Sequence, residues 1–252
     1  YAYCPSNCAS TASWTVVQLE DLGLWGGYVR LTLDSNGHPR MVWLVAPDLG
    51  DGEYHYASCD SQCTNSGNWT VGNTGPAYSE DDGRYFALDN LNRPRIILYN
   101  YHFESQGSYY RFCDSDCTNS ASWWETWLTS EQLSRPSLVF SSGGNPRFLA
   151  MDITTTPNEL RYYACDGSCD NGANWVNTTL STNQASMGYS LRLDSLNRPR
   201  MALYTGYNNA NDDYLLEYVW CNTNCTDSGN WYGYTLGLET FYGVDPDLAY
   251  DS

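Results

Sequence analysis

The stretch YASCDSQCTNSGNW, which runs from Tyr56 to Trp69, sets the pattern for the whole chain. Three residues separate its two cysteines, a tyrosine stands three residues before the first cysteine, and a tryptophan stands ten residues after it. The same arrangement occurs five times, with first cysteines that follow one another after 55, 54, 52 and 56 residues. Self-similarity at a fixed period of this length is the signature of a repeat architecture. We therefore expect one structural unit per repeat.

The ten cysteines form five such pairs, with none left over: Cys4 and Cys8, Cys59 and Cys63, Cys113 and Cys117, Cys165 and Cys169, and Cys221 and Cys225. An even count in fixed pairs is typical of disulfides, which persist in oxidising compartments outside the cytoplasm. Zinc ligation is the alternative, but structural zinc sites usually space cysteines by two residues and bring two pairs together. The chain opens at Tyr1 without an apolar signal segment, so we expect a mature secreted protein or a piece of a longer one. Both options predict an extracellular or cell-surface location.

Each repeat holds four short candidate strands, and one repeat gives Tyr28–Leu33, Met41–Val45, Glu53–Cys59 and Asn68–Val71. Alternation of apolar and polar residues, with turn residues between the segments, favours strands, and no segment shows a helical stripe. Four antiparallel strands per repeat are typical of a propeller blade. A solenoid and a string of small domains are the alternatives, but radial closure covers the edges of blades this small. We predict an all-β, five-bladed β-propeller that forms a single domain over residues 1–252.

The last blade of this propeller is incomplete in the sequence. Residues 1–17 supply a third and a fourth strand, and Asp247–Ser252 matches a first strand, so the N- and C-terminal segments close the blade without a second strand. Three explanations stay open. The chain continues with the missing strand, the blade closes with three strands, or a neighbouring molecule donates a strand and the subunits self-assemble into a filament.

The composition excludes several classes of partner. The 252 residues include 29 acidic side chains and 12 basic ones, all of them arginine, for a formal charge of −17. This charge repels nucleic acid and anionic membranes, and without lysine there is no P-loop lysine or Schiff-base nucleophile. The longest apolar run, Met41 to Ala46, is far shorter than the roughly 20 residues of a membrane helix. We expect neither nucleic-acid binding nor membrane insertion.

One segment carries a family resemblance. Ser168 to Trp175 reads S-x-D-x-G-x-x-W and resembles the Asp-box of sialidase-like BNR repeats. The resemblance implies a propeller blade in which the box forms the turn between the third and fourth strands, away from any active site. Since Asp-boxes occur in enzymes and in non-enzymes, the resemblance implies a fold and little about function.

The other four repeats depart from this box. Asp170 has as its counterparts Ala9, Thr64, Thr118 and Thr226. We expect the side-chain hydrogen bonds of the turn to be partly lost there and the disulfide loop to replace them, at about 1 to 2 kcal/mol per bridge.

An arginine follows a proline in four of the repeats, six residues after Asp34, Asp89, Ser141 or Asp194; these arginines are Arg40, Arg95, Arg147 and Arg200. A hairpin would place the acid and the arginine across its turn, where an ion pair helps to fix the strand register. A ring of anion clamps is the functional alternative. Because the position repeats, we expect a structural role.

Candidate ligand sites lie in the loops outside the repeat pattern, which share one face of the expected propeller. Aromatic side chains there could stack on sugar rings, and we predict ligand contacts for Trp25, Tyr78, Tyr101 and Tyr207. Acidic pairs in the same loops offer the oxygen ligands that calcium prefers, and the candidates are Asp81, Asp82, Asp212 and Asp213. Beyond calcium, no cofactor is predicted. The alternatives without a ligand are that the acids only keep the surface solvated and that the aromatic side chains pack between blades.

Near-equivalent repeats favour repeated weak contacts over one asymmetric catalytic centre. We therefore predict an extracellular, non-catalytic binding or structural module of a cell surface, a matrix or a surface filament, with a glycan or a protein as ligand. The alternative is a glycoside hydrolase or lyase of sialidase-like architecture, since fold alone does not determine chemistry.

Overall fold

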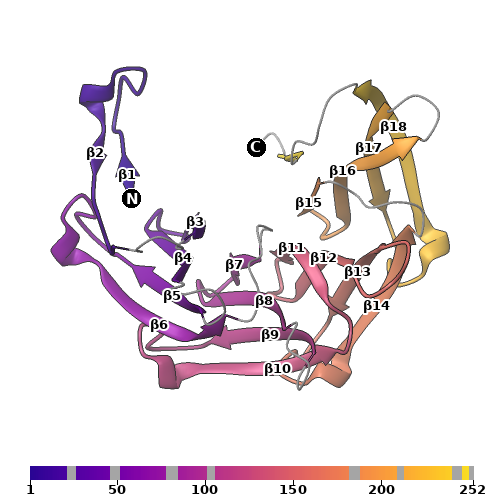
Figure 1. Cartoon of the computed structure of the whole chain (residues 1–252), viewed down its shortest axis with the longest axis horizontal. Coiled ribbons are helices and arrows are strands. Elements are labelled where there is room, and N and C mark those ends of the chain that lie inside the picture. Colours follow the sequence, from indigo (N-terminus) through magenta and orange to yellow (C-terminus); the bar gives the residue numbers. More distant parts are fainter. Residues whose placement is uncertain are drawn as a thin grey trace. The chain divides into compact units, whose positions relative to one another are not determined.

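The computed structural model describes residues 1–21, 27–45, 52–77, 85–100, 106–181, 188–208, 213–239 and 246–249. Within these residues the protein is all-β, with four four-stranded antiparallel sheets, one two-stranded ribbon and single 3-10 turns, and no α-helix. In each sheet the strands lie side by side in chain order (Figure 1). No helix among the described residues is long and apolar enough to cross a membrane.

The strands have the following bounds. The ribbon consists of β1 (Ala2–Tyr3) and β2 (Thr15–Val16). The first sheet consists of β3 (Gly27–Leu33), β4 (Pro39–Val45), β5 (Gly52–Ser58) and β6 (Thr70–Ala77). The second consists of β7 (Phe86–Leu88), β8 (Pro94–Asn100), β9 (Gly107–Cys113) and β10 (Trp123–Thr129).

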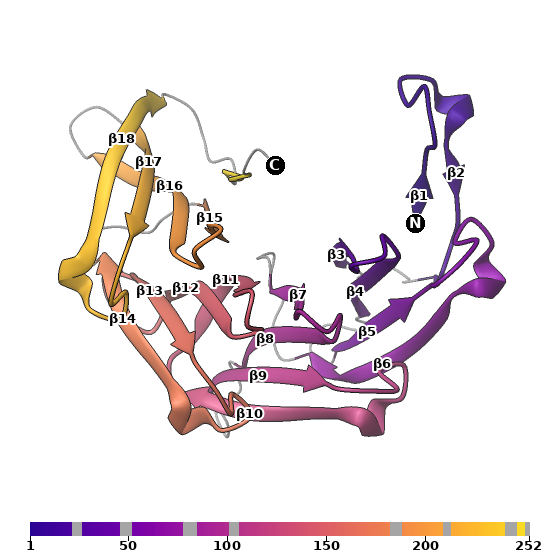
Figure 2. The same cartoon turned by 180° about the vertical axis from the view of Figure 1, so that it is seen from behind.

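The third sheet consists of β11 (Leu133–Phe140), β12 (Pro146–Asp152), β13 (Glu159–Cys165) and β14 (Trp175–Ser181), which Figure 2 shows from behind. The fourth consists of β15 (Gly188–Leu193), β16 (Pro199–Asn208), β17 (Asp213–Cys221) and β18 (Trp231–Glu239). The 3-10 turns are η1 (Thr11–Ser13), η2 (Ser66–Asn68), η3 (Ser120–Ser122), η4 (Gly172–Asn174) and η5 (Ser228–Asn230).

The prediction of four strands per repeat is confirmed for four repeats, but the fourth strand was misplaced. It was predicted over Asn68–Val71, whereas β6 begins at Thr70, because residues 66–68 form the turn η2. The N-terminal segment pairs as a ribbon, as predicted. Of the expected first strand at Asp247–Ser252, residues 247–249 are described and form no strand, and the remainder lies outside the described residues.

The hairpin between β3 and β4 shows how the repeated turn works. The Asp34 carboxylate accepts hydrogen bonds from the backbone N–H groups of Asn36 and His38, each at 2.9 Å. Gly37 takes a positive φ of 80°, which a glycine or an asparagine tolerates best. Asparagine or glycine fills the same left-handed position in the other three hairpins, at Asn92, Gly144 and Asn197.

All five cysteine pairs form disulfides, with Cα–Cα distances of 5.7 to 5.9 Å. The indole N–H of the following tryptophan donates to the carbonyl of the second cysteine, as Trp69 does to Cys63 at 2.8 Å. The expected loss of side-chain hydrogen bonding in this turn is wrong for three of the four departing repeats, while at η1 the N-cap residue Ser10 makes no side-chain hydrogen bond. One residue beyond the Asp-box position, Asn65, Asn119, Asn171 and Asp227 accept a backbone N–H and cap the 3-10 turn.

Contacts divide the chain into two compact units, Tyr1–Glu80 with Cys113–Trp124, and Asp81–Phe112 with Glu125–Ser252. The core of the first unit gathers Val17, Met41, Trp43, Ala57 and Trp69. In the second unit one core joins β8 and β9 to the third sheet, and another joins the third sheet to the fourth. Neighbouring sheets of this unit therefore pack through their faces.

Candidate functional site

Six of the eight predicted loop residues lie outside what the structure describes, and the loop placement of the other two, Tyr207 and Asp213, is wrong because both belong to strands. Trp25, Tyr78, Tyr101, Asp81, Asp82 and Asp212 fall in undescribed segments. The backbones of Tyr207 and Asp213 belong to β16 and β17, but their side chains are not described. Ligand and calcium binding at these residues stays a prediction.

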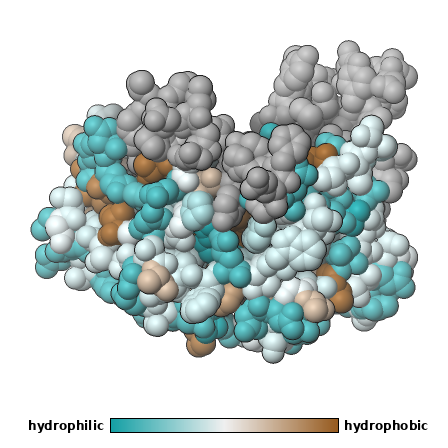
Figure 3. Space-filling model, turned by 60° about the horizontal axis from the view of Figure 1, so that its bottom comes forward, coloured by the Kyte–Doolittle hydropathy of each residue, from teal (hydrophilic) through white to brown (hydrophobic). Residues whose placement is uncertain are grey.

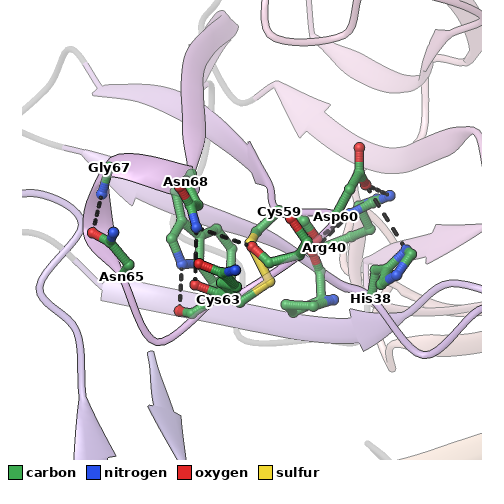
Figure 4. The surroundings of a disulfide bond; sticks show 12 residues. His38, Arg40, Cys59, Asp60, Cys63, Asn65, Gly67 and Asn68 are labelled. Atoms are coloured by element: carbon green, nitrogen blue, oxygen red, sulfur yellow. Dashed lines mark hydrogen bonds and ion pairs between the residues drawn. A yellow bond between two sulfur atoms is a disulfide. The ribbon is translucent and has the colours of Figure 1, made fainter.

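One group of side chains in the first unit has the composition of a metal site: Asp34, His38 and Asp60. Arg40 bridges the two acids: its guanidinium lies 2.8 Å from Asp34. It also lies 2.6 Å from Asp60 (Figure 4). The same guanidinium donates to the carbonyl oxygen of Cys59 at 2.9 Å. A cation would have to displace the arginine. The cluster is therefore an ion-pair network that connects the hairpin turn to the disulfide loop.

Equivalent ion pairs recur in the other sheets. Arg200 pairs with Asp194 at 2.7 Å and donates to the carbonyl of Cys221, also at 2.7 Å. Arg95 pairs with Asp89 at 2.9 Å, and Arg147, whose hairpin has Ser141 in place of the acid, pairs with Asp166. Burial opposes ionisation of Asp34, but hydrogen bonds from His38 and Asn36 and the charge of Arg40 hold its pKa below the usual range. The four repeated arginines, which were expected to be structural, therefore form ion pairs within their own sheets.

A second ionic cluster lies in the third sheet and centres on Arg161. Its guanidinium is 2.6 Å from Glu131, 3.1 Å from Asp152 and 2.9 Å from Glu159. Burial alone would lower the pKa of Arg161, but the surrounding carboxylates raise it. Tyr163 donates a hydrogen bond to Glu131. Burial is the main cause that raises the pKa of Tyr163, and the hydrogen bond to Glu131 is the next.

This cluster contains a tyrosine beside an acid, as a sialidase-like centre requires, but its charges have the opposite arrangement. Three carboxylates converge on one arginine, whereas a sialidase-like centre needs several arginines around one ligand carboxylate. Asp152 is also fully buried, with no exposed surface. The cluster therefore holds the sheet together, and a substrate cannot reach Asp152.

A pocket of about 170 Å³ opens beside the first sheet. It lies between β3, β4 and the segment that follows β2, and its lining consists of Tyr1, Val17, Gln18, Leu19, Glu20, Val29, Met41 and Trp43. Most of these side chains are apolar or aromatic, and Glu20 is the one carboxylate among the described lining residues. Such a combination of apolar walls with a few placed polar groups is typical of ligand sites.

Glu20 is held in place by two side chains of the first sheet. The indole N–H of Trp43 donates to its carboxylate at 3.1 Å, and the imidazole Nδ1 of His55 lies 2.8 Å from the same oxygen. The other ring nitrogen of His55 lies 3.7 Å from Glu53. Trp43 is 3% exposed, so its indole anchors the carboxylate from within the core.

Two residues at this pocket leave the repeat pattern, Trp43 in its lining and His55 beside Glu20, and sequence reasoning missed them. Trp43 has as its counterparts Leu98, Ala150 and Leu203, and His55 has Tyr109, Arg161 and Glu217. The strand that carries His55 shifts register against β6 between Tyr54 and His55. The third and fourth sheets have the same shift at the equivalent positions, so it belongs to the repeat, and only the side chains differ. The usable signal in the sequence was this departure from the repeat at neighbouring positions.

Comparisons with known proteins add a limited result. No protein-family model matches the chain, and no curated protein matches it. Seven chains among solved structures match, and one of them is a fucose lectin from Kordia zhangzhouensis in complex with methyl-fucoside. That match is 18% identical with a TM-score of 0.38, and it covers 60% of this chain and 97% of the lectin. The functional proposal therefore depends on the chain's own residues.

Proposed function

We propose that the chain is an extracellular, non-catalytic binding module built as a five-bladed β-propeller of degenerate Asp-box repeats. The observation that carries the binding function is the pocket beside the first sheet, because Trp43 in its lining and His55, which contacts Glu20, replace residues of the repeat. The five disulfides suit an oxidising, extracellular setting. The Arg161 cluster, with its buried acid, gives the alternative of a sialidase-like hydrolase no support.

Support for five blades comes from a repeated ring contact. The tyrosine before each cysteine pair packs on the tryptophan of the next repeat: Tyr1 on Trp69 at 5.0 Å, Tyr56 on Trp123 at 5.9 Å, Tyr110 on Trp175 at 5.2 Å and Tyr162 on Trp231 at 5.0 Å. The series leaves Tyr218 and Trp14 as its last two members. In a closed five-bladed propeller these two side chains would pack on each other.

The exposed face of the fourth sheet fits this closure. Tyr218 and Trp220 on β17 stack at 5.5 Å, opposite Tyr234 and Tyr232 on β18, which are 65% and 55% exposed. The tyrosines equivalent to Tyr218 in the second and third sheets, Tyr110 and Tyr162, are 4% and 2% exposed because the next sheet covers them. On the face that Figure 3 shows, apolar side chains are scattered among polar ones.

Hydroxyl-radical footprinting tests the closure. Trp14 is 44% exposed in the structure, between Trp69 at 8% and Trp124 at 66%. If Tyr218 covers it in a closed propeller, Trp14 of the monomer should oxidise at a rate close to that of Trp69 and well below that of Trp124. Replacing Tyr218 with alanine should raise the Trp14 rate several-fold, because the ring that covers it is removed. A Trp14 rate equal to that of Trp124 in the monomer would contradict the closed ring. Protection seen only in oligomers would instead favour strand or blade exchange between copies.

Binding without turnover tests the function. Incubated with a glycan array and with a panel of sialosides and algal or plant polysaccharides, the purified chain should retain at least one glycan and release no product. Product formation above that of a heat-denatured sample would overturn the non-catalytic proposal and favour the alternative, a glycoside hydrolase.

A further inference from the structure

We propose that the pocket lined by Glu20 and Trp43 binds a single neutral sugar ring, with Glu20 accepting a ligand hydroxyl and Leu19 and Val29 contacting the apolar face of the ring. The inference rests on the proposed binding function and names its ligand class.

The size of the pocket limits the ligand to one ring. Pockets for drug-sized molecules enclose roughly 300 to 1,000 Å³. The pocket here measures about 170 Å³, which suits one pyranose ring at the end of a glycan and leaves the rest of the chain in solvent.

The polar groups suit a hydroxyl donor. Both N–H contacts on Glu20, from Trp43 and His55, engage the same carboxylate oxygen, Oε2, and His55 also lies 3.0 Å from Oε1. The carboxylate is therefore fixed in orientation and keeps acceptor capacity for the pocket. A hydroxyl that donates to an ionised acceptor forms a bond about twice as strong as a neutral one. Gln18, which is exposed, adds an amide to the lining.

Other ligand classes fit less well. Calcium takes six to eight oxygen ligands, and one carboxylate with two N–H partners does not supply them. A quaternary ammonium needs open aromatic faces, whereas Trp43 is 3% exposed and the ring of Tyr1, the other aromatic lining residue, already packs on Trp69 at 5.0 Å. An anion would meet the Glu20 carboxylate, and a purely apolar molecule would desolvate it without a hydrogen bond. A sugar ring offers both hydroxyls and a C–H face.

Titration with methyl glycosides of hexoses, deoxyhexoses and N-acetylhexosamines tests the site, with the indole N–H resonance of Trp43 as a local readout. At least one glycoside should bind with a stoichiometry of one and shift this resonance. Glu20→Gln keeps the side-chain size and removes the charge, and it should weaken binding by about 10- to 100-fold. Val29→Trp should fill the pocket and abolish binding.

The matched control is Leu31→Trp on the same strand. Val29 and Leu31 are 44% and 52% exposed, but only Val29 is among the pocket residues, so the Leu31 variant should bind normally. If no glycoside in the panel binds the folded protein, or if tetramethylammonium shifts the Trp43 resonance instead, the sugar site is wrong. Glycan binding that survives both Glu20→Gln and Val29→Trp would also refute this site while leaving the proposed function intact.

Discussion

Replacing Trp175 with alanine should lower the free energy of unfolding by about 3 to 5 kcal/mol, the range for large aromatic residues removed from a core. Trp175 is 8% exposed and packs on Tyr110 at 5.2 Å and on Phe148 at 5.5 Å. Its indole N–H also donates to the carbonyl of Cys169 at 2.9 Å. The substitution leaves a cavity between two sheets and an unpaired carbonyl at the disulfide loop. Urea denaturation followed by circular dichroism measures the loss.

Trp124→Ala is the control for this experiment. Trp124 follows the repeated tryptophan of β10 and is 66% exposed, so its removal should change stability by less than about 0.5 kcal/mol. Equal losses in the two variants would mean that the repeated tryptophan does not join neighbouring sheets.

Most of the fold could be predicted because the repeat aligns equivalent segments. Asp34 and Arg40 were expected to face each other across a hairpin, and they lie 2.8 Å apart. The start of the fourth strand was missed because Ser66, Gly67 and Asn68 form a 3-10 turn whose cap, Asn65, looks like any polar loop residue. Local hydrogen bonding of this kind leaves no mark on apolar periodicity.

The pocket could not be predicted from the sequence in the same way. Glu20, Trp43 and His55 come from three segments, and each is an ordinary residue in its own segment. Sequence reasoning sought sites in charged and aromatic loops, whereas this pocket uses strand residues that replace repeat positions. The sequence shows that Trp43 and His55 depart from the repeat, but it does not show that Glu20 lies beside them.

Removing Arg161 should be as costly as removing Trp175. Arg161→Leu leaves Asp152, which has no exposed surface, without its cation, and leaves Glu131 and Glu159 close together with no charge between them. Breaking a buried ion pair by deleting one partner costs about 3 to 5 kcal/mol, because the remaining charge is desolvated and uncompensated. The free energy of unfolding in urea at neutral pH should fall by that amount.

Two further variants separate charge from packing. If the loss comes from uncompensated charge, Asp152→Asn combined with Arg161→Leu should be more stable than Arg161→Leu alone, since the buried acid is then neutral. Arg192→Leu removes an arginine from an exposed pair, with Asp247 at 3.0 Å, and should cost less than about 1 kcal/mol because solvent screens that pair. A double variant no more stable than Arg161→Leu would assign the loss to packing and would contradict an electrostatic role for the cluster.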